Sequence, residues 1–163
     1  MDIHISPIGK IKSKYTDADT GGRQPTIDGQ EGSLIINKQF HEGLCGLELF
    51  SHIIALYYFH QQNEVKMKAK PCFDPSIEHG IFASRYPTRP NHIGISIWSI
   101  KSVKKNIITC HDIDVLNGTP LLDIKPYVKQ FDHRENTRCG WYDLIDWSSV
   151  ESKAFKNPEI TEA

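Results

Sequence analysis

Two arginines and an asparagine lie close together in a proline-rich segment in the middle of the chain. Arg85 and Arg89 stand on either side of Pro87, and Asn91 follows Pro90. Each proline fixes its own φ and restricts the residue before it, so this connection between two apolar runs is stiff. A stiff segment holds two guanidinium groups at a roughly fixed separation, which suits a carboxylate, a phosphate or a nucleic acid. We therefore predict an anion-binding site here, with a solvated charged loop as the competing interpretation.

Two further polar groups stand in loops or at strand ends, where binding sites tend to lie. Arg23-Gln24-Pro25 lies in a loop rich in Gly, Asp and Thr, and His60-Gln61 ends an apolar run. Taken alone, the first is typical of a solvated loop and the second of a histidine that caps a core strand.

A fourth group combines acidic residues with a lysine and a tyrosine. The stretch 112–117 is rich in Asp and Asn, and an extended segment with Asp123, Lys125 and Tyr127 follows it. Alternate residues of an extended chain face the same side, so these three side chains should project together. A salt-bridged surface stripe would have the same pattern.

Several common site classes are missing from the sequence. It has no G-x-S-x-G elbow, P-loop or G-x-G-x-x-G fingerprint. Its cysteines (Cys45, Cys72, Cys110 and Cys139) have no C-x-x-C spacing, and the eight histidines form no H-E-x-x-H or short His/Cys cluster. We therefore expect free thiols and no metal site.

Composition is that of an ordinary globular protein. The chain has 163 residues, 39% of them hydrophobic and 24% charged, and a formal net charge of −1. This length indicates one domain with a real core. The N-terminus lacks the features of a signal peptide, and no apolar run could span a membrane, so we expect a cytoplasmic protein without a membrane partner. Any nucleic-acid partner would have to be held by a local basic patch.

Short apolar runs at fairly even spacing predict many strands. Residues 53–60 are apolar almost to their end, which favours a strand buried on both faces, although a buried helix shares that pattern. A short helical turn is expected within 40–47 and a polar loop within 66–79. Lys104-Lys105-Asn106 is typical of a hairpin turn, and Asn117-Gly118 of a tight turn. The expected strands are 3–11, 32–36, 53–60, 80–84, 93–102, 106–113 and 121–127. This pattern predicts an all-β barrel or sandwich.

Read in order, these groups resemble the TsaA-like, or TrmO-type, family of S-adenosylmethionine-dependent methyltransferases. The resemblance extends over nearly the whole chain and rests on ordered blocks. They are residues 7–13, Arg23-Gln24-Pro25, residues 46–52, Phe59-His60-Gln61, residues 80–96, 114–120 and 122–127, and Gly140-Trp141. The chain departs from the family pattern at Ser84, Tyr86, His92 and Asn117.

The resemblance implies a small closed or partly open β-barrel with short helical insertions over 1–147, followed by a polar tail over 148–163. It also implies a homodimer with its site near the subunit interface, S-adenosylmethionine as cofactor and tRNA as substrate. The implied reaction is N6-methylation of threonylcarbamoyl-adenosine next to the anticodon. Implied cofactor contacts are Arg23, Gln24, Pro25, His60, Gln61, Arg85, Ile95, His111, Asp112, Ile113 and Asp114. Candidates for the acceptor side are Arg89, Asn91, Asp123, Lys125 and Tyr127.

Within this resemblance, Arg85 is expected to bind the cofactor carboxylate and Asp123 to serve as the base. Lys125 and Arg89 would contact phosphate or the threonyl carboxylate. Two alternatives remain open: a methyltransferase for a small metabolite or another macromolecule, and a non-catalytic module that senses S-adenosylmethionine.

Overall fold

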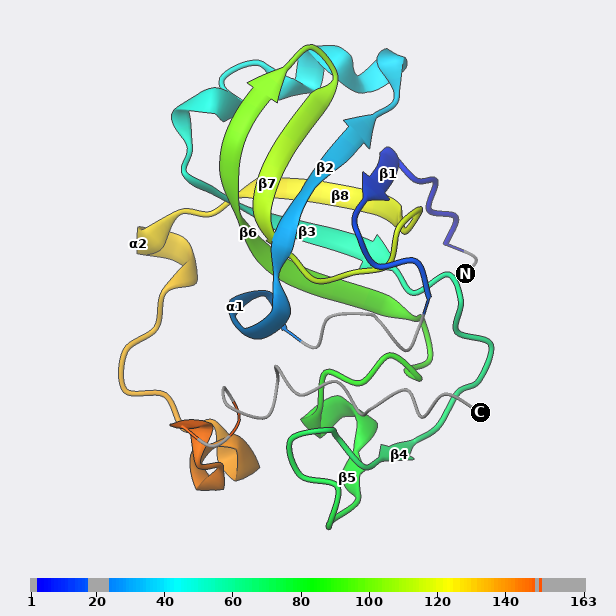
Figure 1. Cartoon of the computed structure of the whole chain (residues 1–163), viewed down its shortest axis with the longest axis vertical. Helices are drawn as coiled ribbons and strands as arrows, with labels where there is room; N and C mark the ends of the chain where they lie inside the picture. Colours follow the sequence, from blue (N-terminus) through cyan, green and yellow to red (C-terminus); the bar gives the residue numbers. More distant parts are fainter. Residues whose placement is uncertain (1–2, 18–23, 149, 151–163) are drawn as a thin grey trace, which may run out of the picture.

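The structure is a computed structural model that describes residues 3–17, 24–148 and 150. Six strands form a closed antiparallel barrel in the order β1-β2-β7-β6-β3-β8 (Figure 1). The barrel strands are β1 (Gly9–Lys12), β2 (Gln30–Ile36), β3 (His52–Tyr58), β6 (Ile93–Lys104), β7 (Ile107–Ile113) and β8 (Pro120–Pro126). The expectation of a small all-β barrel with short helical insertions is confirmed.

The other elements are short. A two-stranded sheet pairs β4 (Lys68–Ala69) with β5 (His79–Gly80) below the barrel in Figure 1. The helices are α1 (Pro25–Asp28), α2 (Lys129–Asp132) and the 3-10 helices η1 (Lys38–Leu44), η2 (Leu47–Leu49), η3 (Ile81–Ala83) and η4 (Gly140–Leu144). In the part of the chain that the structure describes, no helix has the length and hydropathy needed to cross a membrane.

The barrel core follows from the two-residue period of the strands. Along β3, Ile53, Ala55 and Tyr57 are buried, and the residues between them are half-buried. Their partners on β6 include Trp98, which is fully buried. Burying alternate apolar side chains on one face removes them from water and sets the strand register.

Both predicted turns are present. The β6–β7 hairpin turns at Lys105 and Asn106, and Lys105 has a φ of +54°. The turn at Asn117-Gly118 precedes β8, and Gly118 has a φ of +82°, which glycine adopts without steric cost.

Four sequence expectations were wrong in detail. Within 3–11 only Gly9–Lys12 is a strand, and residues 81–83 form a 3-10 helix rather than a strand. The run 53–60 is not buried on both faces, because its alternate residues lie on the half-exposed outer surface of a small barrel. The predicted loop 66–79 contains β4 and the first residue of β5. The tail 148–163 lies almost wholly outside the described residues, so its boundary stays a prediction.

Candidate functional site

A hydrogen-bonded polar cluster lies inside the barrel around Asp114, directly after β7. The Oδ1 atom of Asp114 accepts hydrogen bonds from Trp98 Nε1 at 3.1 Å and from Ser96 Oγ at 3.2 Å. The Tyr57 hydroxyl lies 3.0 Å from Ser96 Oγ. All four side chains are buried. Burial, helped by the nearby Asp114 carboxylate, raises the pKa of Tyr57, so the phenol keeps its proton. The barrel thus holds a buried acidic centre supported by neutral donors.

Tyr57 reaches this cluster because the facing strand carries a glycine. A Cβ on Gly94 would lie 2.2 Å from the Tyr57 ring atom Cε2, so only glycine leaves room for the ring. The ring also stacks on Trp98, with centroids 5.8 Å apart and planes 11° apart. Gly94 and Tyr57 are register partners on β6 and β3.

Asp112 lies two residues earlier, beside helix α1. It has a φ of +65°, which is unusual for a non-glycine residue, and its Oδ2 accepts a hydrogen bond from Ser99 Oγ at 2.7 Å. The backbone approaches Gly29 so closely that a Cβ there would lie 2.3 Å from the Cα of Asp112. This contact holds α1, which begins at Pro25 after its N-cap Gln24, against the end of β7. The structure therefore brings the end of α1, at Gly29, to Asp112, with the Pro25 carbonyl also close to Gly29.

His60 comes to the same end of the barrel from β3. Its Nδ1 lies 3.5 Å from the Thr119 hydroxyl, just before β8, and His60 is half-buried. The preceding Phe59 donates its backbone N–H to the carbonyl of His92 at 2.8 Å. Gln61 is exposed.

A hollow of about 330 Å³ lies beside Arg85. It is lined by Phe82, Ala83, Ser84, Arg85, Cys139, Gly140, Trp141 and Tyr142. The pKa of Tyr142 is raised by burial, and the Arg85 charge and backbone N–H oppose that rise. The same guanidinium also opposes the pKa rise of Tyr57. Arg85 thus lines the hollow, whereas its effect on the buried cluster is weak, because its charge is the smallest of the causes that act on the pKa of Tyr57.

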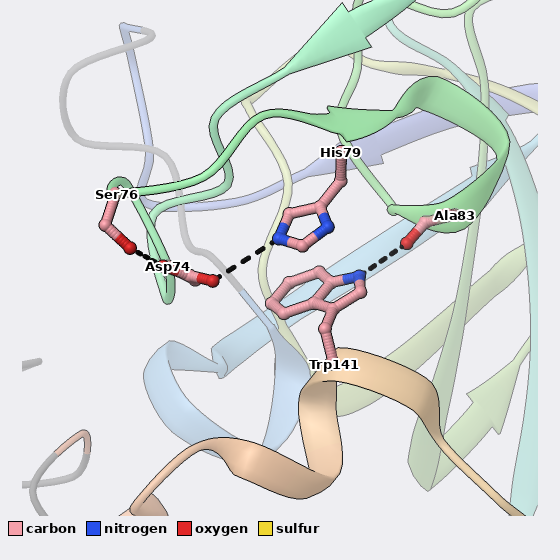
Figure 2. Close-up of polar contacts among 5 residues, drawn as sticks. All are labelled: Asp74, Ser76, His79, Ala83 and Trp141. Atoms are coloured by element: carbon pink, nitrogen blue, oxygen red, sulfur yellow. Dashed lines mark hydrogen bonds and ion pairs between the residues drawn. The ribbon is translucent and has the colours of Figure 1, made fainter.

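Trp141 is fixed in one orientation at the wall of this hollow (Figure 2). Its Nε1 donates to the carbonyl of Ala83 at 2.8 Å, and the His79 ring stacks on it with centroids 4.4 Å apart. His79 Nε2 lies 3.3 Å from Asp74 Oδ2, and Asp74 also accepts a hydrogen bond from Ser76 Oγ. These two bonds lower the pKa of Asp74, that of Ser76 contributing most. The side-chain contacts that run from Asp74 to Trp141 connect the β4–β5 region to η4.

Arg89 engages one nitrogen of its guanidinium within its own segment. Its Nη1 donates to the carbonyls of Ser84 and Tyr86, at 3.2 and 3.4 Å. Arg89 therefore stiffens the segment that carries Arg85. Asn91 is exposed nearby.

The other candidates for the acceptor side lie on the outer surface of β8. Lys125 Nζ and Asp123 Oδ2 are 2.8 Å apart, which confirms that these side chains project together. The Tyr127 ring instead packs edge-on against His52, at a centroid distance of 6.3 Å. Asp123 pairs with Leu56, which pairs with Ile95, so two strand spacings, roughly 10 Å, separate Asp123 from Ile95. Within one subunit, this surface is separate from the buried cluster.

The remaining predicted cofactor contacts are dispersed. Ile95 is half-exposed on the outer surface, and the Ile113 side chain is fully buried, so any ligand contact of Ile113 would be made by its backbone. His111 is exposed, with Nδ1 4.0 Å from Glu31 Oε2. Arg23 lies outside the described residues.

Sequence reasoning missed Tyr57, Ser96 and Trp98 around the buried carboxylate. The one available signal was the hydroxyl of Ser96, which stands at an inward-facing position of β6 between Gly94 and Trp98. Trp141 was named only as part of the Gly140-Trp141 block and Tyr142 was not predicted to belong to a site, whereas both line the hollow beside Arg85.

The arrangement can bind a ligand that carries both charges. Arg85 offers a cation, the end of β7 offers the carboxylates of Asp112 and Asp114, and the hollow offers aromatic walls. Among residues 3–17, 24–148 and 150, no group of three or more His, Cys, Asp and Glu side chains could hold a metal ion.

Comparison with known proteins gives one consistent result. The family model of the tRNA-methyltransferase O N-terminal domain matches residues 10–133. A probable S-adenosyl-L-methionine-binding protein of Pyrococcus abyssi is 44% identical over 142 residues, which cover 86% of this chain and 77% of that protein. A human tRNA (adenine(37)-N6)-methyltransferase is 35% identical over 142 residues, 83% of this chain and 32% of that protein. The crystal structure of TrmO from Pseudomonas aeruginosa superposes with a TM-score of 0.70 at 34% identity and covers 86% of this chain and 62% of that one. The match thus spans most of the archaeal relative but only about a third of the human one.

Proposed function

Because the chain belongs to the family of tRNA-methyltransferase O N-terminal domains, we propose that it methylates tRNA with S-adenosylmethionine as methyl donor. The proposed acceptor is N6 of threonylcarbamoyl-adenosine next to the anticodon. Support for the reaction comes from the similarity to the human tRNA (adenine(37)-N6)-methyltransferase, and support for the cofactor from the probable S-adenosyl-L-methionine-binding protein of Pyrococcus abyssi. The observation that carries it is the pair of carboxylates at the end of β7, Asp112 and Asp114, together with the aromatic hollow that Arg85 lines.

The residues present fit S-adenosylmethionine. This cofactor has a carboxylate, an amino group, a sulfonium and a flat adenine. Arg85 is an exposed cation suited to the carboxylate. Asp112 supplies a half-buried carboxylate for a positively charged part of the ligand. When bound, the cofactor supplies a methyl group already activated on a positively charged sulfur.

The protein then needs to align the acceptor and exclude water. Trp141 and Tyr142 form the apolar wall of the hollow, and the bond from Trp141 to Ala83 keeps this wall in place. Arg89 holds the Arg85 segment through two backbone carbonyls. The amide-like acceptor nitrogen is a weak nucleophile, so a base near it would help, and Asp123 is the carboxylate that we propose.

A homodimer would explain how Asp123 takes part. The outer surface of β3 and β6 carries a row of large apolar side chains, of which Tyr58, Ile95 and Ile97 are exposed and Leu56 is half-buried. Asp123 and Lys125 border this row. We propose that a second copy of the chain covers the row, which would bring Asp123 of one subunit toward the site of the other. Sedimentation should then show a dimer at micromolar concentration, and Ile95→Glu should give a monomer with a weakened site.

One experiment tests the reaction directly. The protein is incubated with methyl-labelled S-adenosylmethionine and total tRNA from a strain that lacks its own enzyme of this kind, and the nucleosides are analysed by mass spectrometry. A gain of one methyl group on threonylcarbamoyl-adenosine is expected. Label found in a small molecule would show that this molecule, and not tRNA, is the methyl acceptor. Cofactor binding without any transfer of label would show that the protein is a sensor.

Two variants assign roles within this experiment. Arg85→Ala should weaken cofactor binding by roughly 1.5–3 kcal/mol, because a charged hydrogen bond is lost. Lys68→Ala, an exposed cation on β4, is the matched control and should bind normally. Asp123→Asn should spare cofactor binding and lower turnover by roughly 10²–10⁴-fold if Asp123 acts as base. Full turnover in this variant would leave alignment alone to explain the rate.

A further inference from the structure

We propose that one outer side of the barrel binds the phosphate backbone of the RNA substrate. This basic face is formed by β1, β2, β7 and the end of β6, with the residues directly after β1 and β6. Its members are Lys10, Lys12, Lys14, Lys101, Lys104, Lys105 and His111. The inference rests on the proposed tRNA substrate, and its test below separates the two ideas.

Strand register places lysines at the two sides of this face. One row of register partners runs Lys10–Ile35–Ile107–Lys104, from β1 across β2 and β7 to β6. The row crosses three strand spacings, so its two lysines stand roughly 14 Å apart on the same side of the sheet. Both are exposed, as is Lys12 one row further along.

The second row supplies hydroxyl groups between the cations. It runs Lys12–Ser33–Thr109–Ser102 across the same four strands. Serine and threonine hydroxyls, together with lysines, are common donors to phosphate oxygens, and such contacts position a nucleic acid without reading its sequence. The single row between these two points inward, because Ile11, Leu34 and Ile108 are fully buried.

This face carries far more positive charge than negative charge. Among the described residues of the four strands, Glu31 is the only carboxylate with an exposed side chain. It forms an ion pair with Lys101. Six lysines and one glutamate give the face a formal charge of +5 with histidine neutral, so the rest of the chain carries −6 to reach the net −1. A polyanion would therefore be attracted to this side and repelled elsewhere.

The basic face also adjoins the candidate site. His111 directly precedes Asp112 on β7, and Lys101 lies two residues after Ser99, which bonds to Asp112. At the opposite end, Lys104 and Lys105 lie at the β6–β7 hairpin at the top of Figure 1. An RNA strand held on this face would thus pass the end of β7 where the cofactor residues gather. The chain as a whole has no excess of basic residues, but a local basic patch of this kind would be enough to attract a nucleic acid.

Salt dependence of RNA binding tests the proposal. The variant Lys10→Gln/Lys12→Gln/Lys104→Gln removes three exposed charges without touching the core. The matched control is Lys68→Gln/Lys70→Gln/Lys129→Gln, also three exposed lysines but outside the face. Binding of labelled tRNA is measured by anisotropy between 50 and 200 mM KCl, with cofactor affinity measured by calorimetry.

We expect the face variant to bind tRNA at least tenfold more weakly than the control at 50 mM KCl. Its plot of log K against log salt should be shallower by roughly 2, since each lost phosphate contact removes 0.7–0.9 from the slope. Its cofactor affinity should equal that of the control, and methyl transfer should show a raised KM for tRNA with an unchanged kcat. Equal tRNA affinity and slope in both variants would overturn the proposal.

The outcomes separate this inference from the proposed function. Methyl transfer to tRNA with an unchanged KM in the face variant would refute the face and leave the function standing. Charge-dependent tRNA binding without any methyl transfer would refute the function and leave the face standing. Lysine-dependent binding to phosphatidylserine vesicles in the absence of tRNA binding would assign the face to an anionic membrane and overturn the proposal.

Discussion

The indole Nε1–H of Trp98 donates a hydrogen bond to the carboxylate of Asp114 over 3.1 Å, inside the barrel. Both residues are buried, and Trp98 is the largest fully buried side chain among the described residues. The bond joins β6 to the segment after β7, so the residue that fills the core also supports the acidic centre of the site. The core and the candidate site therefore share one contact.

Replacing Asp114 should test this shared contact. Asp114→Ala leaves the buried donors of Trp98 and Ser96 without their acceptor, so we expect a loss of roughly 1–3 kcal/mol in the free energy of unfolding. Asp114→Asn keeps an oxygen in place and should cost less. Urea unfolding followed by tryptophan fluorescence measures both values. Equal losses would mean that the negative charge, rather than the hydrogen-bond acceptor, supports the fold.

Gly94→Ala should disturb the site through Tyr57. The new Cβ would fall 2.2 Å from the Tyr57 ring, so the ring must shift and the overpacking should cost roughly 1–3 kcal/mol. Gly43→Ala is the control, since its Cβ would meet nothing within 4 Å. Thermal unfolding of both variants checks this prediction. An unchanged melting temperature in Gly94→Ala would show that the ring moves without cost.

The four cysteines should separate into two classes in an alkylation experiment. Burial raises the pKa of the Cys110 thiol to about 12, whereas Cys45, Cys72 and Cys139 are exposed. Because the thiolate is the reactive form, iodoacetamide at pH 8 should modify those three and spare Cys110 in the native protein. Mass spectrometry with peptide mapping counts the modified sites, and denaturant should release the fourth. Rapid native labelling of Cys110 would contradict the closed barrel.

Arg89 should act by positioning rather than by charge. Arg89→Ala removes two bonds to the carbonyls of Ser84 and Tyr86, which should loosen the Arg85 segment and weaken cofactor binding several-fold. Arg89→Lys keeps the charge but loses the planar guanidinium, so it should show a similar loss. Calorimetric titration with S-adenosylmethionine compares the three proteins. Recovery in Arg89→Lys would instead indicate a direct contact to an anion.

Local pattern was enough to predict the barrel strands but not every boundary. The alternation in 93–102 and 106–113 found β6, β7 and their hairpin, because inward and outward residues differ in polarity there. Ile3 and Ile5 led to the wrong prediction of a strand, because their apolar side chains are not in the core but 77% and 57% exposed. Residues 81–83 bury only Ile81 and turn at once into the proline-rich segment, so the local apolar run had no strand partner to pair with.

The candidate site likewise has some features that local sequence predicts and others that it does not. Spacing alone predicted that Asp123 and Lys125 lie side by side, because a strand sets that distance locally. It could not predict that Trp141 bonds to Ala83, 58 positions away, since only the tertiary fold brings them together. It also could not show that Arg89 turns back onto its own segment.

The closed barrel has one weakly paired strand interface, between β1 and β8, which we call the joint. Only Gly9 and Lys10 have ladder partners there, on Leu121 and Pro120, with three further backbone bonds from Ile8, Ile11 and Gly118. Since strands that make few bonds open at a lower free energy than the rest, amide hydrogen exchange should be fastest along this joint. The joint also unites parts of the chain more than 100 residues apart, so it should form late in folding. The barrel would then assemble as an open sheet with β1 and β8 at its two edges, which closes into a cylinder only in the final step.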